Sequence, residues 1–170
     1  INRWEPWNAL RTVRSGTVDA VQVIYNIFDQ APEDELFPAC REHDVAVIAR
    51  VPFDEGSLTG TLTRHSTWPA GDWRNTYFVR ENLDASVDRA EALKPLVPSG
   101  LTLPELALEF ILANPIVSTV IPGMRKPADV RSNLAASDTL PLSSEILLQL
   151  KAHRWDRPPT NWSSPSAPWS

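Results

Sequence analysis

Two adjacent cations, Arg125 and Lys126, lie between a predicted strand and a predicted helix, in a position that suits a phosphate. Residues 117–121 form a β-branched run bounded by prolines, which is typical of a buried strand in a parallel sheet. Gly123 can take positive φ and lets a ligand approach the backbone, and Pro127 favours the first turn of a helix. The unpaired N–H groups at that helix N-terminus, beside two cations, predict an anion site. An ordinary strand–loop–helix connection with two solvated cations explains this stretch alone equally well.

Two more polar segments lie in or after predicted strands. Gln22 interrupts the apolar run of residues 19–26, and a polar amide there is either satisfied locally or faces a ligand. Residues 50–60 follow the buried run of residues 45–49, and this glycine-punctuated loop is a second candidate for ligand contact. Asp54 and Glu55 in this loop are a pair of carboxylates, but adjacent side chains seldom face the same point. We therefore interpret them as solvated loop residues or as a ribose contact.

The composition excludes several classes of protein. The chain has 170 residues, of which 42% are hydrophobic and 22% charged, so it is not disordered overall. A net charge of -5 and a pI near 5.2 argue against nucleic acid as a partner. We find no apolar run of membrane-spanning length, no signal peptide pattern and no spacing of metal ligands. The single cysteine, Cys40, cannot form an internal disulfide, which predicts a reducing, cytoplasmic location.

Strands and helices are predicted to alternate along the chain. We expect helices at about residues 6–14, 31–43, 77–93 and 104–113, another from Pro127, and a last one from Ser143 to near His153. A long polar loop at residues 61–76 carries Trp68 and Trp73, and Tyr77 and Phe78 follow it. These four aromatic residues form either a lid over substrate or a cover for the protein wall. Residues 1–153 are expected to form the folded part, and residues 154–170 an irregular tail rich in proline and tryptophan, with Trp155 against the body.

Alternating strands and helices predict a parallel sheet with right-handed crossovers. Three strands are too few for a stable doubly wound sheet, because both edges would be open. The first residue is isoleucine and the single methionine is Met124, so we expect the chain to be part of a longer protein. A (β/α)₈ barrel is the best candidate, since such barrels often bind phosphate on the loops after their last two strands.

Residues 19–28, 47–60 and 120–124 resemble the aldo-keto reductases, in the bacterial branch that uses NADP. The three segments occur in the family's order and spacing. The resemblance implies that the chain holds strands six to eight of a TIM barrel, which is the C-terminal half. It also implies NADP as the cofactor and the reduction of an aldehyde or ketone by hydride transfer.

The resemblance also assigns roles to particular residues. A glutamine at the place of Gln22 hydrogen-bonds the nicotinamide carboxamide, and an asparagine at the place of Asn133 reaches the adenine. The loop along the ribose and pyrophosphate would include Arg50, Val51, Pro52, Phe53, Gly56 and Leu58. The 2′-phosphate of the adenosine would be held by the turn and helix start that contain Gly123, Met124, Arg125, Lys126 and Asp129.

This sequence departs from the family pattern at two of these positions. Arg50 stands where many relatives carry an aromatic residue that stacks on the nicotinamide; a guanidinium can stack on a ring or bind a carboxylate. Asp129 stands where many relatives carry a phosphate-binding arginine, and Arg131 is a candidate substitute.

The catalytic residues of the family come from the first half of the barrel, and no position of this chain corresponds to them. We interpret Tyr25 as a packing residue at a strand end and Tyr77 as the start of a surface helix, so neither is expected to be a catalytic acid. The expected partners are a small carbonyl substrate and the missing N-terminal half-barrel. The alternative is a non-catalytic half-barrel that pairs with itself or with another chain. A phosphate-binding barrel of other chemistry is a weaker third reading.

Overall fold

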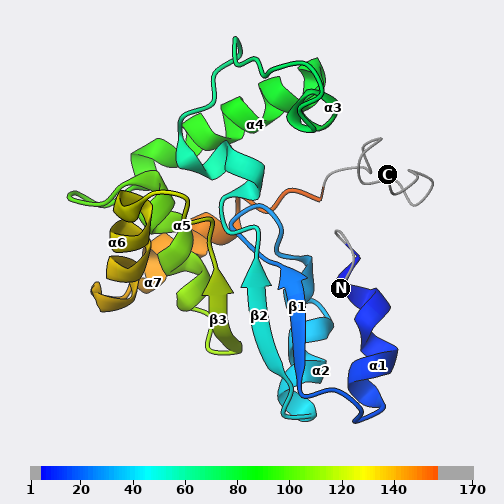
Figure 1. The fold of residues 1–170 in the computed structure, drawn as a ribbon. Coiled ribbons are helices and arrows are strands. Elements are labelled where there is room, and N and C mark those ends of the chain that lie inside the picture. The colour runs from blue at the N-terminus through cyan, green and yellow to red at the C-terminus, as the bar shows by residue number, and fades with distance from the viewer. Residues whose placement is uncertain (1–4, 157–170) are drawn as a thin grey trace.

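Residues 5–156, which the computed structural model describes, form a three-stranded parallel sheet with helices packed against one face (Figure 1). The strands are β1 (Ala20–Ile24), β2 (Ala46–Arg50) and β3 (Val117–Ile121), in the order β1-β2-β3. Ile24 pairs with Arg50 and Arg50 with Ile121, so the three strands end at one edge of the sheet. The predicted α/β class and parallel arrangement are confirmed, and the sheet is consistent with part of a barrel.

Helices precede the first strand of the sheet, connect the strands and follow the last of them. The α-helices are α1 (Leu10–Arg14), α2 (Leu36–Glu42), α3 (Arg74–Tyr77), α4 (Arg80–Leu93), α5 (Leu103–Leu112), α6 (Pro127–Ala135) and α7 (Ser144–Lys151). The 3-10 helices are η1 (Pro6–Ala9), η2 (Ala31–Glu33), η3 (Asp54–Thr59), η4 (Lys94–Leu96) and η5 (Ala136–Asp138). Helices α3 and α4 lie beyond the carboxyl ends of the strands (Figure 1). None of the helices between residues 5 and 156 has the length and apolar character needed to cross a membrane.

The sequence correctly predicted where two of these helices begin. Thr102 caps α5: its hydroxyl accepts a hydrogen bond from Glu105 N (3.4 Å), and the Glu105 carboxylate accepts one from Thr102 N (2.7 Å). The bonds from Thr102 lower the pKa of the Glu105 carboxyl. Ser143 caps α7 in a similar way, since its hydroxyl accepts from Ile146 N (3.3 Å).

The two faces of the sheet differ in exposure. Val21, Val23, Val47 and Ala49 are buried on the face that the helices cover. The other face carries Gln22, Ile48, Arg50, Thr119 and Ile121, which are exposed or half-buried. The prediction that β3 is a buried core strand is therefore wrong, because Ser118, Thr119 and Ile121 are all exposed. In the described chain β3 has β2 as its one neighbouring strand, and no helix covers its second face.

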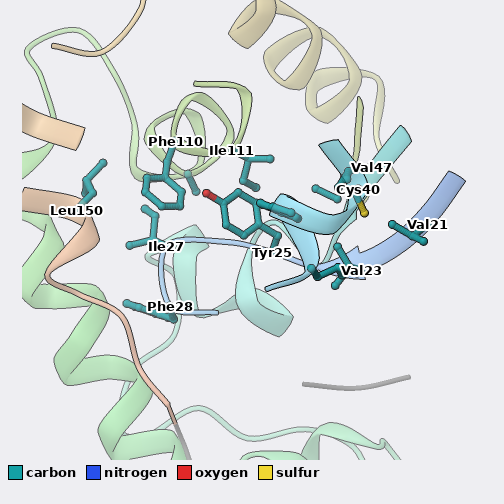
Figure 2. Close-up of a cluster of buried hydrophobic side chains, with 14 of the residues drawn as sticks. Val21, Val23, Tyr25, Ile27, Phe28, Cys40, Val47, Phe110, Ile111 and Leu150 are labelled. Atoms are coloured by element: carbon teal, nitrogen blue, oxygen red, sulfur yellow. The ribbon is translucent and has the colours of Figure 1, made fainter. Parts of the chain in front are cut away.

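The main core lies between the sheet and the helices, and Tyr25 is at its centre (Figure 2). The Tyr25 ring stacks against Phe110 (centroids 5.7 Å apart) and meets Phe37 edge-on (4.9 Å). Its hydroxyl donates to Glu33 Oε1 (2.5 Å) and accepts from Asn114 Nδ2 (3.1 Å). Burial raises the pKa of this hydroxyl, so Tyr25 is a packing residue, as predicted. Cys40 is also fully buried, which raises the pKa of its thiol.

A second, smaller apolar cluster, called the second cluster below, lies in the region of α3 and α4. It consists of Tyr77, Phe78, Leu83 and Val87, with Leu62 and Trp68 packed against it. Trp68 stacks on Phe78 with the ring centroids 5.2 Å apart. The prediction that Tyr77 opens a surface helix is wrong: Tyr77 ends α3 and is fully buried. The chain bends at Phe78 before α4 begins at Arg80, and this bend turns the Tyr77 side chain into the cluster.

The chain after α7 packs against the main core, as predicted for Trp155. The Trp155 backbone N donates to Phe28 O (2.8 Å), and its ring meets the Phe28 ring edge-on (6.1 Å). The Arg89 guanidinium lies over the indole, 4.4 Å from its centroid. Arg154 forms two hydrogen bonds to the Asp34 carboxylate (2.6 and 2.7 Å), which lower the pKa of Asp34. Most of the predicted irregular tail, residues 157–170, lies outside the described residues.

Candidate functional site

The carboxyl edge of the sheet brings together the three segments that the sequence singled out. Gln22, Ile48 and Thr119 are successive register partners across the strands, and Arg50 ends β2 beside Ile24 and Ile121. Because side chains alternate along a strand, Gln22 and Arg50 project on the same, uncovered face. The loops after β2 and β3 leave the sheet from this edge (Figure 1).

The loop after β2 has an unusual backbone conformation. Among the described residues four that are not glycine have positive φ, and three of them lie here: Val51 (56°), Asp54 (46°) and Glu55 (56°). Gly56 follows with φ of 113°, a value that a residue with a Cβ rarely adopts. A left-handed β-branched residue such as Val51 is a true outlier, and each such residue costs about 1–3 kcal/mol. Strain of this kind gathers at ligand sites, because only a strongly constrained surrounding structure can hold it.

Hydrogen bonds within the loop hold this conformation. Phe53 O accepts from Gly56 N (2.9 Å) and from Leu58 N (3.1 Å), and Phe53 directly precedes η3. Leu58 is fully buried and anchors the end of the loop in the core. Asp54 is 1% exposed, so the interpretation of this residue as loop solvation is wrong. The left-handed backbone at Asp54 turns its side chain inward, which its polar sequence context did not indicate.

Arg50 lies half-buried at the start of this loop. Burial lowers the pKa of its guanidinium, and the charge of Glu55 opposes that shift. The two residues are therefore close enough to interact, and Glu55 places a carboxylate beside the end of β2. A guanidinium in this position can stack on a planar ring or bind an anionic group that enters from the open face.

The turn after β3 leads into α6 and carries the two predicted cations on its surface. Met124, Arg125 and Lys126 are exposed, and neither cation forms an ion pair within residues 5–156. Asn133 Nδ2 donates to Gly123 O (3.2 Å), so the second turn of α6 holds the start of this segment. Gly123 does not use positive φ, which corrects the expectation based on its freedom to do so.

Asp129 is in the first turn of α6, and its carboxylate accepts a hydrogen bond from Lys126 N (3.0 Å). It therefore caps the helix that was predicted to bind a phosphate, and it lowers the positive charge there. Arg131, the candidate substitute for a phosphate-binding arginine, is exposed in the next turn. The cations that can meet an anion at this helix start are thus Arg125 and Lys126.

Sequence reasoning missed one residue at this edge. Asn26 follows β1, is fully buried, and donates from Nδ2 to Val51 O (3.0 Å), which joins the loops after β1 and β2. An asparagine at the end of an apolar strand was the available signal, since asparagine often caps and bridges turns. Among residues 5–156 no three His, Cys, Asp or Glu side chains come together in a way that could hold a metal ion.

A family model for the Aldo/keto reductase family matches residues 6–154. The NADH-specific methylglyoxal reductase of Escherichia coli is 38% identical over 123 residues, covering 71% of this chain and 37% of that protein. The NADP(+) aldo-keto reductase yakc of Schizosaccharomyces pombe is 27% identical over 125 residues, covering 70% of this chain and 37% of that protein.

The fold is also similar to that of solved aldo-keto reductases. The holo form of AKR11C1 from Bacillus halodurans superimposes with a TM-score of 0.62 at 27% identity, over 91% of this chain and 46% of that one. This chain therefore spans less than half the length of the relatives that it matches. Because the family model covers nearly all of the described residues, this chain belongs to the aldo/keto reductase family.

Proposed function

We propose that this chain is the cofactor-binding C-terminal part of an NADPH-dependent aldo-keto reductase, with strands six to eight of its barrel. The parent enzyme would reduce an aldehyde or ketone by hydride transfer. The observation that carries the proposal is the grouping of the strained loop after β2 and the turn after β3 at one edge of the sheet, with Gln22 on the open face next to that edge. In parallel α/β folds, ligands bind at this carboxyl edge.

Each part of this edge suits a different part of a dinucleotide. The amide of Gln22 on the open face can hydrogen-bond the carboxamide of a nicotinamide, which supplies the hydride chemistry when bound. The loop from Val51 to Leu58 can lie along the ribose and pyrophosphate. The exposed cations Arg125 and Lys126 suit a 2′-phosphate at the start of α6, with Asn133 near the adenine.

The chain would supply the cofactor site and not the proton donor. The Tyr25 hydroxyl already donates to Glu33 in the core, and burial raises its pKa. Tyr77 is fully buried in the second cluster. Both positions support the proposal that the catalytic acid comes from a part of the enzyme outside this chain.

The choice between NADPH and NADH depends on the start of α6. Arg125 and Lys126 favour NADPH, whereas the Asp129 carboxylate disfavours a second anion beside it. One relative is named as NADH-specific and another as NADP-dependent, so the relatives point in both directions. We propose NADP because two exposed cations without partners in the described chain outweigh one carboxylate that already caps the helix.

Titration with NADPH and with NADH, followed by nicotinamide fluorescence, tests this proposal. We expect Arg125→Ala to weaken NADPH binding about tenfold, since it removes a charge-assisted contact worth ~1.4 kcal/mol. NADH binding should not change, because NADH lacks the 2′-phosphate. Arg11→Ala, which removes an exposed cation from α1, is the matched control and should leave both affinities unchanged.

Two results would contradict the proposal. A chain with a folded circular dichroism spectrum that binds neither cofactor would exclude a cofactor site in this chain by itself. An equal loss of NADPH and NADH affinity in Arg125→Ala would mean that Arg125 contacts a group that both cofactors carry, and not the 2′-phosphate.

The uncovered face of the sheet favours a second candidate function. In this alternative the chain is a non-catalytic half-barrel that pairs with another copy of itself. Gln22, Thr119 and Ile121 are exposed there, and in the described chain β1 and β3 each have one neighbouring strand. The same face would meet the N-terminal half-barrel in a complete enzyme. Open edges and an uncovered sheet face both favour association.

Sedimentation velocity separates this second function from the first. Pairing predicts a species of twice the 19.0 kDa chain mass, which Ile121→Lys should convert to monomer by placing a charge on the open face. Leu140→Lys is the control, since Leu140 is 88% exposed and lies outside the sheet. A stable monomer at all concentrations would exclude pairing.

A further inference from the structure

We propose that Asn26 is the positioning residue for the loop from Val51 to Leu58, and that it thereby sets the affinity of the cofactor site. This inference rests on the proposed function in assigning that loop to the cofactor. Asn26 lies in the turn after β1 and does not reach the open face, so its effect passes through the loop backbone.

The Asn26 side chain uses all of its hydrogen-bonding capacity. Its Oδ1 accepts from Phe28 N (2.8 Å) and Asp29 N (2.9 Å), which folds the turn after β1. Its Nδ2 donates to Asp29 Oδ2 (2.9 Å) and to Val51 O (3.0 Å). Two donated and two accepted bonds fix the amide in one orientation, and the residue is 0% exposed. The bond to Val51 therefore comes from a rigid group.

Val51 is the residue at which the chain leaves β2, and its conformation sets the direction of the loop. Its φ of 56° is strained for a β-branched side chain, so an outside group must hold it. Val51 O accepts from Asn26 Nδ2 and also from Asp54 N (3.1 Å), which begins the turn into η3. Tyr25 N donates to Arg50 O (3.3 Å), so the link between the two strands continues up to this point.

The loop is thus held at both ends, by Asn26 at Val51 and by the buried side chain of Leu58. Without the bond from Asn26, Val51 can relax toward negative φ. That change would redirect the peptide between Val51 and Pro52, and with it the N–H groups of the following turn. A ligand lying along this loop would then lose its preformed surface.

The experiment uses Asn26→Asp, which retains the acceptor for Phe28 N and Asp29 N but cannot donate to Val51 O or to Asp29 Oδ2, and places a second carboxylate beside Asp29. Asn26→Ser is the second variant, because its short hydroxyl still accepts in the turn but does not reach Val51. Val87→Ala is the control, since it lowers stability by truncating a side chain of the second cluster, whose members include no residue of this loop. Hydrogen exchange of a peptide covering residues 51–58 is measured in each variant without cofactor, and NADPH and NADH are then titrated.

We expect faster exchange across residues 51–58 in both Asn26 variants, and about tenfold weaker binding of both cofactors. Val87→Ala should change neither. Loop exchange equal to that of Val87→Ala would overturn the proposal, and so would a loosened loop with unchanged affinity. If the unmodified chain binds no cofactor, the proposed function fails, while the exchange data still decide whether Asn26 holds the loop.

Discussion

Replacing Phe110 by alanine is expected to lower the free energy of unfolding by about 3–5 kcal/mol. Phe110 is 2% exposed and stacks on Tyr25, at the centre of the core shown in Figure 2. It also lines a pocket of about 350 Å³ between α2, α5 and α7, which is open to solvent on one side. Removing the ring enlarges a space that the neighbouring side chains already do not fill, so relaxation recovers little of the loss. A domain of ordinary stability, about 5–15 kcal/mol, would lose a large part of it.

Urea unfolding followed by far-ultraviolet circular dichroism measures this effect. Leu112→Ala in the same helix is the control, because Leu112 is 39% exposed. Leucine and alanine have similar helix propensities, so this truncation should lower the free energy of unfolding by less than about 1 kcal/mol. Similar midpoints for the two variants would mean that the Phe110 ring contributes no more to stability than the half-exposed Leu112 side chain, which would contradict its central place in the core.

Replacing Trp155 by alanine is expected to cost about 2–3 kcal/mol, less than a fully buried tryptophan would because the ring is only partly buried. The change removes the edge contact with Phe28 and leaves the Arg89 guanidinium without the indole beneath it. It retains the backbone bond from residue 155 to Phe28 O, so the effect reports the side chain alone.

Thermal unfolding of Trp155→Ala is compared with that of Trp7→Ala, whose ring is 53% exposed. We expect a clearly lower midpoint for Trp155→Ala. Equal midpoints would favour the sequence-based boundary after residue 153, with the following residues separate from the body of the fold.

The strands and helix starts could be predicted because their signals are local. A β-branched run between prolines is enough to place β3, and Thr102 with Glu105 is enough to place the start of α5. The same local pattern could not predict that β3 is exposed. Burial depends on which strands and helices lie beside a run, and an edge strand can have the same composition as a central one.

The conformation of the candidate site was also beyond a reading of the sequence. Left-handed backbone is expected at glycine or asparagine, and Val51 is neither, so its strain could not be foreseen. Its carbonyl oxygen accepts a hydrogen bond from Asn26, which is 25 residues away in the chain. Tyr77 was misplaced for a similar reason, because the helical pattern of the sequence runs across the bend at Phe78. The family resemblance placed the three segments in the right order but carried no information on these local conformations.

The packing of Trp155 on Phe28 has a consequence for how the protein is made. Gln30 Nε2 also donates to Leu150 O (3.3 Å), so the turn after β1 is completed by groups more than a hundred residues later. During synthesis β1, β2 and their helices leave the ribosome before these groups emerge. The growing chain therefore exposes Phe28 and neighbouring apolar side chains until these later groups emerge, and apolar surface exposed in this way is prone to aggregation.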